Sequence, residues 1–452
     1  MSVLERISDY IVQRTDTNRL FADTCAAVVV ATAVGNKIYI ADKIGDLNLN
    51  IFGIIIGGSG ISNKTVAIKI ARAMLERLGE RCYPNLEYND LKKYGLLAPT
   101  KFTPEAMTKW FVDKRDWLVS EIPEHSSDIR ARDVVPEGTI IGDEYSKMFS
   151  GAQNRDYLAT TLEYVSTLYD GYVESSATIG RGVESVKSVY SSFLSASTFY
   201  LLKLMNGLDF FIQGNGTRML WTYDDSHEPE LVTDDMAESF FQSLWGRRGT
   251  NKIVDELVAE LFRLRKMVEQ TDPQDTILFL HQDAAKYLGN YHYRQKNEAI
   301  AHYRRDKLDP DANYISRLAQ NAIKLAGIHA ISRYTSQDFW RSNPPIILLQ
   351  DAEWGVRKVE AHYQDYLRIR QAIELMSSES SSHSFRSDHQ KILNAIDRCG
   401  GKASISQLLT ITRWKGNDLT TILTDMTAAG MVTEDYVRTG GRPAKVYKKR
   451  QQ

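Results

Sequence analysis

The chain has 452 residues, with 56 Lys and Arg against 57 Asp and Glu, and a formal charge of −1 at pH 7. At about 150 residues per domain, this length predicts roughly three domains. A composition of 43% hydrophobic and 25% charged residues excludes an intrinsically disordered chain. The balanced charge excludes a uniformly cationic protein, although one domain can still carry a basic patch.

The cysteines and the apolar runs indicate a soluble protein of the cytoplasm. Cys25, Cys82 and Cys399 lie far apart and form no C-x-x-C pair. A disulfide framework and a cysteine-rich zinc site are therefore not expected. The longest smooth apolar stretch, Ala26 to Val34, is shorter than the roughly 20 residues that span a bilayer. The N-terminus has no cationic-then-apolar signal layout.

In chain order, the first half alternates helical and strand patterns. Residues 1–50 begin with apolar residues at helix spacing and continue into Val/Ala/Ile-rich runs. The short apolar run Ile51 to Ile56 predicts a buried parallel strand, and Thr65 to Leu78 predicts an amphipathic helix. Val134 to Ile141 and Val186 to Ala196 are further strand candidates. The pattern predicts an α/β fold, with a parallel sheet covered by helices on both faces.

The second half divides at a serine-rich segment. From about Asp234 to Ile373 the pattern is almost wholly helical, whereas Ser377 to Ser387 has almost no large apolar residue. We therefore predict an α/β core over 1–233, a helical lid over 234–376, a flexible linker over 377–387 and a separate domain over 388–452. From Asp388 onward 11 Lys/Arg face 6 Asp/Glu, a net of +5, so the rest, with 45 against 51, carries −6.

The strongest motif follows the first predicted strand. It matches the phosphate-binding pattern G-x-x-x-x-G-K-T except that Asn63 stands at the second glycine. In such a loop, helix amides and Lys64 surround phosphates, and the Thr65 hydroxyl ligates magnesium. The predicted nucleotide-binding residues are Gly58, Ser59, Gly60, Ile61, Ser62, Asn63, Lys64 and Thr65.

Two alternatives stay open at this loop. The position of Asn63 requires either a positive φ, which Asn tolerates well, or only a compact side chain. The whole segment also fits a glycine-rich turn before a helix, with Lys64 in solvent.

An acidic pair ends a later predicted strand. Asp143 and Glu144 follow Thr139-Ile140-Ile141-Gly142, and Asp143 lies 78 residues after Thr65. Apolar residues followed by Asp-Glu form the Walker B arrangement, in which Asp143 holds magnesium and Glu144 polarises the attacking water. An ordinary acidic strand-to-helix turn is the alternative.

With the segments that follow them, these motifs resemble the AAA+ ATPases, and most closely the minichromosome-maintenance (MCM) helicases and MCM-like ATPases of plasmids, viruses and mobile elements. Thr167-Leu168-Tyr169-Asp170-Gly171 resembles a segment that follows Walker B in this group. The resemblance covers roughly residues 20–375. No zinc-ribbon segment precedes the phosphate loop here, so the double-hexamer contacts of true MCM helicases are not expected.

The resemblance also implies roles for three further residues. Ser197 stands where the sensor 1 strand usually carries Asn or Thr, and Arg218 lies in a segment similar to the one that carries the arginine finger. Arg317 matches the γ-phosphate-sensing arginine of the lid helix. An intrachain salt bridge is the alternative for Arg218.

The implied function is an ATP-hydrolysing motor on DNA, with ATP and Mg²⁺ as cofactors. The resemblance implies a replicative helicase or translocase of a mobile element or virus, in a prokaryotic or viral host. An arginine finger acts on a neighbouring subunit, so a homo-oligomeric ring, a hexamer, is expected. The alternative is a DNA-binding replication initiator or remodeller that uses ATP as an assembly switch. A nucleotide-binding regulator is a third possibility, although Glu144 argues against it.

The tail beyond residue 388 resembles a winged-helix domain. Three short helical segments, with Ser404 as an N-cap candidate, precede a Gly-rich basic turn between two strand segments. In that fold the third helix enters the major groove and the wing contacts the backbone or the minor groove. The predicted DNA-binding residues are Lys415, Asn417, Arg438, Arg442 and Lys445. A role in protein contacts is the alternative.

Two other features carry no assignment. His281, His292 and His302 have spacings that match no zinc motif, which favours a surface position. Trp245 to Gly249 fits a nucleic-acid contact or a solvated loop equally well.

Overall fold

A computed structural model describes most of the chain as two compact units, Met1–Gln371 and Ala372–Gln452. The described residues are 1–15, 17–41, 46–58, 63–121, 134–145, 155–173, 176–178, 182–184, 186, 188–198, 214, 216–224, 250–270, 277–334, 345–412, 416–428, 431–437 and 444–449. Within a few helices and strands only the backbone is described.

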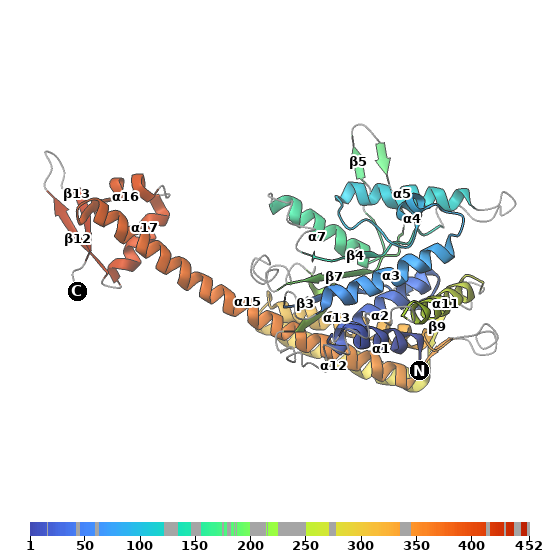
Figure 1. Cartoon of the computed structure of the whole chain (residues 1–452). Coiled ribbons are helices and arrows are strands. Elements are labelled where there is room, and N and C mark those ends of the chain that lie inside the picture. Colours follow the sequence, from blue (N-terminus) through green and yellow to red (C-terminus); the bar gives the residue numbers. More distant parts are fainter. Residues whose placement is uncertain are drawn as a thin grey trace, which may run out of the picture. The chain divides into compact units, whose positions relative to one another are not determined.

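A parallel sheet of four strands forms the centre of the first unit (Figure 1). In spatial order its strands are β4 (Ile140–Gly142), β7 (Phe193–Ser197), β3 (Phe52–Gly57) and β8 (Leu220–Asp224). β3 is buried along its whole length, as its continuous apolar sequence predicts. An isolated parallel bridge between Leu97 and Thr139 extends the sheet beyond β4. The predicted parallel α/β core is confirmed at this level.

Helices flank this sheet. In chain order they are α1 (Val3–Thr15), α2 (Arg19–Val34), α3 (Lys64–Cys82), α4 (Tyr88–Tyr94), α5 (Pro104–Ser120), α7 (Arg155–Tyr169) and α11 (Thr250–Glu269), with 3-10 turns η1 (Gly35–Lys37) and η3 (Gly216–Arg218). α2 packs against α1, α3 and β3, so the residues before the phosphate loop belong to the same core.

Helix α2 accounts for the apolar N-terminal run. The stretch Arg19–Lys37 is long and apolar enough to cross a membrane, but 83% of the window that passes this test is buried inside the protein. A mostly buried core helix meets the same criterion, so this one stretch among the described residues is weak evidence for a membrane span.

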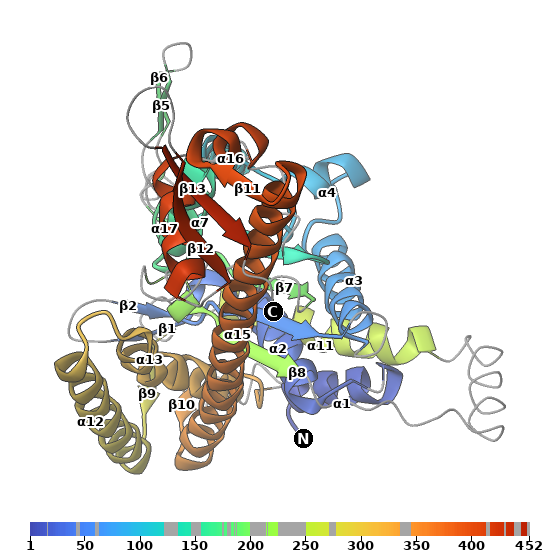
Figure 2. The ribbon, with the colours of Figure 1, turned by 90° about the vertical axis from the view of Figure 1, so that its left-hand side faces the viewer.

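The region predicted as wholly helical also contains strands. β9 (Ile277–Leu280) and β10 (Ile346–Ile347) join β1 (Tyr39–Ala41) and β2 (Asp46–Asn48) in a second sheet of order β10-β9-β1-β2. The almost wholly helical pattern predicted for 234–373 misses these two short strands, because they are too brief to show a period of their own. α12 (Gln282–Arg305) and α13 (Pro310–Ile331) form the helical part and pack against each other (Figure 2).

Helix α11 packs on the core although the predicted boundaries place it in the lid. It contacts α2 and α3, and Arg265 pairs with Glu137 at 3.0 Å with both side chains nearly buried. Arg77 of α3 pairs with Asp255 at 2.9 Å.

The serine-rich segment is helical. α15 (Leu349–Arg398) runs through residues 377–387 without a break in its backbone, so the segment predicted as a flexible linker is helical. Serine lowers helix stability only slightly, and this segment contains neither Gly nor Pro to end a helix. The division between the units falls at Gln371/Ala372, a few residues earlier than predicted.

The second unit has its own core. After the end of α15 come β11 (Lys402–Ser404), α16 (Ile405–Thr412), α17 (Gly416–Ala428), β12 (Val432–Val437) and β13 (Ala444–Lys449), with sheet order β11-β13-β12. Ile392, Leu408, Leu423 and Tyr447 are among its buried residues. Ser404 caps α16: its Oγ accepts from Gln407 N at 3.3 Å, while Gln407 Oε1 accepts from Ser404 N at 2.9 Å. The predicted helices, cap and hairpin are confirmed, and β11 is an addition.

Candidate functional site

The predicted nucleotide-site residues gather at one edge of the central sheet. Because β3, β4, β7 and β8 are parallel, their carboxyl ends meet at the same edge. The phosphate loop follows β3, Asp143 and Glu144 follow β4, and Ser197 ends β7. Neighbouring strands lie about 4.8 Å apart, so all three segments fall within about 10 Å of one another across the sheet.

The phosphate loop enters α3 through a left-handed residue. Asn63 has φ 47° and ψ 13° and is the one non-glycine residue with positive φ in the described part of the chain. Its carbonyl accepts from the amides of Val66 and Ala67, which closes the first turn of the helix. The first of the two explanations for Asn63, a positive φ, is therefore confirmed. Ser59, Gly60, Ile61 and Ser62 lie outside the described residues.

Lys64 is the first residue of α3, and its side chain reaches back to Gly58. Its ammonium donates to Gly58 O at 3.0 Å, and the residue is only 5% exposed. Burial lowers the pKa of Lys64, and the nearby Glu144 carboxylate partly offsets this effect. The alternative of a lysine in solvent is therefore wrong for this structure.

Glu144 is held by the strand that lies between β3 and β4. Ser197 Oγ donates to Glu144 Oε1 at 2.6 Å, and Ser197 is fully buried. The hydrogen bond fixes a half-buried carboxylate that follows the end of another strand, β4. Residues 53 positions apart are thereby joined at the edge where the phosphate loop begins.

Asp143 and Thr65 offer oxygen atoms for a hard cation. Asp143 is exposed, and no hydrogen bond or ion pair engages it among the residues that the structure describes. Thr65 is half-buried in the first turn of α3. Carboxylate and hydroxyl oxygens suit Mg²⁺, which keeps several waters and needs few protein ligands, so these two residues fit the predicted ion.

Arg218 lies at the opposite edge of the sheet. It precedes β8, which runs parallel to β3, so about 16 Å of strand separates it from the phosphate-loop edge. Its guanidinium pairs with Asp170 at 2.7 Å and donates to Gly214 O at 3.0 Å. The alternative of an intrachain ion pair is present in this structure. The same placement keeps Arg218 away from its own chain's phosphate loop.

Arg317 lies near the same edge as Arg218. It lies on α13, whose Tyr314 donates to the carbonyl of Met219, the residue after Arg218, at 3.2 Å. Tyr169 packs edge-on against Phe52, the first residue of β3. Arg317 is half-buried and donates to Gln320 at 3.0 Å.

A buried polar network connects this second edge to the sheet. Lys324 donates to Asn50 O and Oδ1 at 3.2 and 2.7 Å and lies 3.9 Å from the centre of the Tyr169 ring. Asn50 in turn donates to Tyr169 O and Ser191 O. No sequence pattern predicts this network, because its members come from four distant segments.

In the second unit only part of the predicted DNA surface is described. Lys415, Arg438 and Arg442 lie outside the described residues, and Asn417 is described only as backbone of α17. Lys445 pairs with Glu434 at 2.6 Å. The hairpin lysines Lys448 and Lys449 likewise pair with Asp435 and Asp397. Acidic side chains of the same unit thus offset the described hairpin cations.

Sequence reasoning missed two features of the first unit. β5 (Ser176–Thr178) and β6 (Gly182–Glu184) form an antiparallel hairpin that projects from the body (Figure 1). Asp224, which is buried, ends β8 opposite Gly57 at the phosphate-loop edge. Strands of three residues carry almost no periodic signal, so β5 and β6 could not be predicted. The apolar residues before Asp224 are a detectable strand pattern, and they could have indicated β8.

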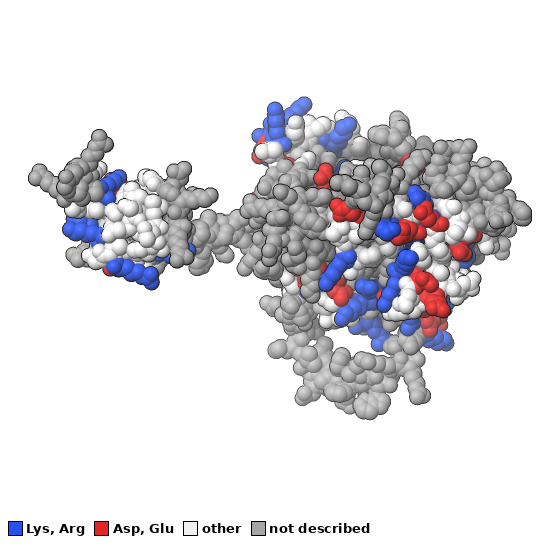
Figure 3. Space-filling view, turned by 90° about the horizontal axis from the view of Figure 1, so that it is seen from above, with Lys and Arg blue, Asp and Glu red and all other residues white. Residues whose placement is uncertain are grey.

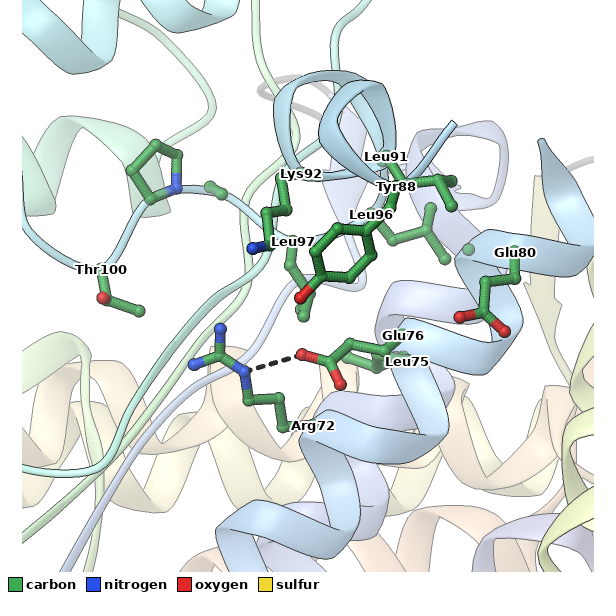
Figure 4. Close-up of a pocket in the computed structure, with 14 residues that line it drawn as sticks. Arg72, Leu75, Glu76, Glu80, Tyr88, Leu91, Lys92, Leu96, Leu97 and Thr100 are labelled. Atoms are coloured by element: carbon green, nitrogen blue, oxygen red, sulfur yellow. Dashed lines mark hydrogen bonds and ion pairs between the residues drawn. The ribbon is translucent and has the colours of Figure 1, made fainter. Parts of the chain in front are cut away.

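A cavity of about 370 Å³ lies beside the sheet between α3, α4 and residues 96–100 (Figure 4). Arg72 and Glu76, one turn apart on α3, line this cavity and pair at 3.0 Å, and Arg72 also donates to Ile141 O at 3.4 Å. Arg72 therefore connects the cavity wall to β4, the strand that carries Asp143.

Comparisons with family models and with curated proteins assign no family to this chain. No protein-family model matches the chain, and no curated protein matches it. The function proposed below therefore rests on the fold and on the geometry of the site.

Proposed function

We propose that the first unit is an AAA+ ATPase of the MCM-like group and that it acts as a motor on DNA. The observation that carries the proposal is the contact between Ser197 and Glu144 beside the phosphate loop. A catalytic carboxylate must point at the attacking water. The buried Ser197, on the strand β7 between β3 and β4, holds the Glu144 carboxylate in a fixed orientation.

The chain's own residues divide the work of phosphoryl transfer. Lys64 offsets phosphate charge, and its low exposure strengthens this interaction by excluding water. Glu144 accepts a hydrogen bond from the attacking water while Ser197 keeps it in place. Thr65 and Asp143 would hold Mg²⁺, which when bound neutralises charge developing on the phosphates.

The β5–β6 hairpin is the element that we expect to move with hydrolysis. Eight residues separate β6 from β7, the strand whose far end contacts Glu144. Because Ser197 at the end of β7 contacts Glu144, a shift of the Glu144 side chain would act on β7 and, along the chain, on the segment that leads back to the hairpin. Coupling of this kind requires a continuous packed path between the two sites.

Substitutions at the site test the proposal directly. Lys64→Ala should abolish ATP binding, whereas Glu144→Gln should keep binding and lose turnover by about 10² or more. ATP binding is measured with a fluorescent analogue and turnover by phosphate release. Normal turnover in Glu144→Gln would refute the assignment of Glu144.

A forked-DNA assay separates the motor from the alternative. Strand separation that requires ATP and is lost in Glu144→Gln supports a helicase. ATP-dependent DNA binding that Glu144→Gln retains, without strand separation, supports an initiator or remodeller that uses ATP as an assembly switch.

A further inference from the structure

Helix α12 exposes a row of cations and aromatic rings that the nucleotide site does not use. The row consists of Lys286, Tyr293, Lys296, Ile300, Tyr303 and Arg304, and we call it the α12 stripe. With 3.6 residues per turn, these six residues fall within an arc of about 100°. The stripe is about 27 Å long at 1.5 Å per residue.

The stripe is open to solvent. Tyr293 is 69% exposed, Tyr303 52% and Ile300 39%, and the three cations are exposed as well. The opposite side of the helix supplies the core contacts, through buried residues such as Leu288 and Tyr291. Figure 2 shows α12 at the margin of the first unit, next to α13.

The stripe is cationic because its charges are not neutralised. Within the described part of the chain, Lys286, Lys296 and Arg304 have no ion-pair or hydrogen-bond partner. The two acidic residues of α12, Asp283 and Glu298, fall outside the arc. On the coloured part of the first unit in Figure 3, Lys/Arg and Asp/Glu are interspersed, and the described hairpin lysines of the second unit are paired with acids.

We propose that the α12 stripe binds single-stranded nucleic acid. Lys286, Lys296 and Arg304 would contact phosphates, and Tyr293 and Tyr303 would stack on bases. Alternation of cations with exposed rings suits a single strand because every base offers a π-face and every linkage a negative charge. An acidic protein segment would match the cations but would leave the two rings without a specific partner.

The test compares two stripe variants with a control of equal charge. One variant combines Lys286→Gln, Lys296→Gln and Arg304→Gln, and the other combines Tyr293→Leu and Tyr303→Leu. The control combines Lys37→Gln, Lys101→Gln and Lys252→Gln, which removes three exposed lysines outside the stripe. Binding of labelled oligothymidylate to the full-length protein is followed by anisotropy from 50 to 300 mM salt, without nucleotide.

The charge variant should lose at least about tenfold in affinity, and its log–log salt slope should become shallower by about two, at roughly 0.7 per phosphate contact. The tyrosine variant should lose about tenfold while keeping the salt slope, because stacking releases no counterions. The control should change little in either quantity. Circular dichroism melting confirms that each variant is folded.

Three outcomes would overturn the proposal. The first is a charge variant that binds no worse than the control. The second is a loss confined to the charge variant, which would indicate non-specific attraction of any polyanion. The third is displacement of the strand by an acidic peptide with the tyrosine variant unaffected, which would assign the stripe to a protein partner. Because the assay uses no ATP, these outcomes are independent of the proposed ATPase.

Discussion

A single hydrogen bond at the sheet edge joins two residues that were predicted from separate sequence patterns. Ser197 was expected from a family resemblance and Glu144 from a strand-end motif, and the structure places their side chains 2.6 Å apart. A buried hydroxyl that donates to a carboxylate fixes the direction in which that carboxylate points. At the scale of residues, this pair is the strongest support for an ATPase.

Ser197→Ala should lower ATP turnover about tenfold, because Glu144 then loses the donor that aims it. Nucleotide affinity should stay nearly constant, since Ser197 does not belong to the phosphate loop. Steady-state phosphate release and equilibrium binding of a fluorescent ATP analogue separate the two effects.

The matched control is Ser195→Ala on the same strand. Ser195 Oγ is also buried but donates to the backbone carbonyl of Gly142 at 3.0 Å. If Ser195→Ala lowers turnover as much as Ser197→Ala, the effect is a general loss of packing in β7, and the positioning role of Ser197 fails.

Lys114 predicts a pH dependence of stability. The ammonium donates to Gly95 O and Glu137 O, and burial lowers its pKa to about 7. Between about pH 7 and 10.5 the unfolded chain holds a proton on this lysine that the folded chain has released. The contribution of Lys114 to the free energy of unfolding should therefore rise with pH, by at most about 1.4 kcal/mol per pH unit.

Urea unfolding of the wild type and of Lys114→Met at pH 7, 8 and 9 measures this contribution. The variant should be less stable throughout, because two buried carbonyls lose their donor, and the gap should widen as the pH rises. A gap that stays constant or narrows would show that Lys114 remains charged in the folded protein. The control is Lys109→Met, which removes a half-buried lysine of the same helix that pairs with Asp113.

Among the elements, α15 is the largest departure from expectation. A serine-rich stretch suggested a coil, yet the helix is continuous from Leu349 to Arg398. Its first part is anchored in the first unit, where Tyr366 donates to Asp311 and Asp365 accepts from Tyr223 N. Its last part contributes Ile392 and Ile396 to the core of the second unit.

Truncation after Ser380 should leave a folded first unit with unchanged thermal unfolding of that unit, because its compact part ends at Gln371. Affinity for duplex DNA should fall, and its salt dependence should become shallower, because any basic contacts of the second unit are lost. Calorimetry and anisotropy with a labelled duplex report the two quantities. Unchanged duplex affinity and salt slope would instead assign the second unit to protein contacts.

At the scale of the whole molecule, the two edges of the central sheet carry different chemistry. Lys64, Asp143, Glu144 and Ser197 lie at the carboxyl edge, whereas Arg218 lies at the amino edge. A parallel strand cannot present both of its ends to one ligand. If Arg218 acts on a nucleotide, that nucleotide must be bound by another copy of the chain.

Arg218→Ala and Lys64→Ala should each abolish turnover as homomers, and mixing them should restore part of it. An interface that pairs an intact loop with an intact arginine reappears in mixed assemblies, and such an arginine contributes about 10³–10⁵ in rate. Phosphate release is measured across mixing ratios at fixed total protein.

Asp170→Ala is the matched control for Arg218→Ala, because it breaks the same ion pair and keeps the arginine. Retained turnover in Asp170→Ala with no turnover in Arg218→Ala separates a role in catalysis from a structural ion pair. If the mixtures stay inactive while both variants still assemble, Arg218 does not act between subunits.

The sequence by itself determined the features that depend on neighbours in the chain. The apolar run before Gly57, the helix after Asn63, the need for a residue that tolerates positive φ and the Ser404 cap are all local, and the structure confirms each. Local backbone sterics and periodic burial fix such features within a few residues.

Only the tertiary structure decided what depends on residues far apart. The strand order, the Ser197–Glu144 bond, the Arg218–Asp170 pair and the Lys324–Asn50 network join segments separated by 48 to 274 positions. No local pattern records such pairings, because each follows from how the strands are ordered and which edge each loop reaches. The helical state of residues 377–387 belongs to the same class, since serine has only a weak preference and the packed segments on either side decide it.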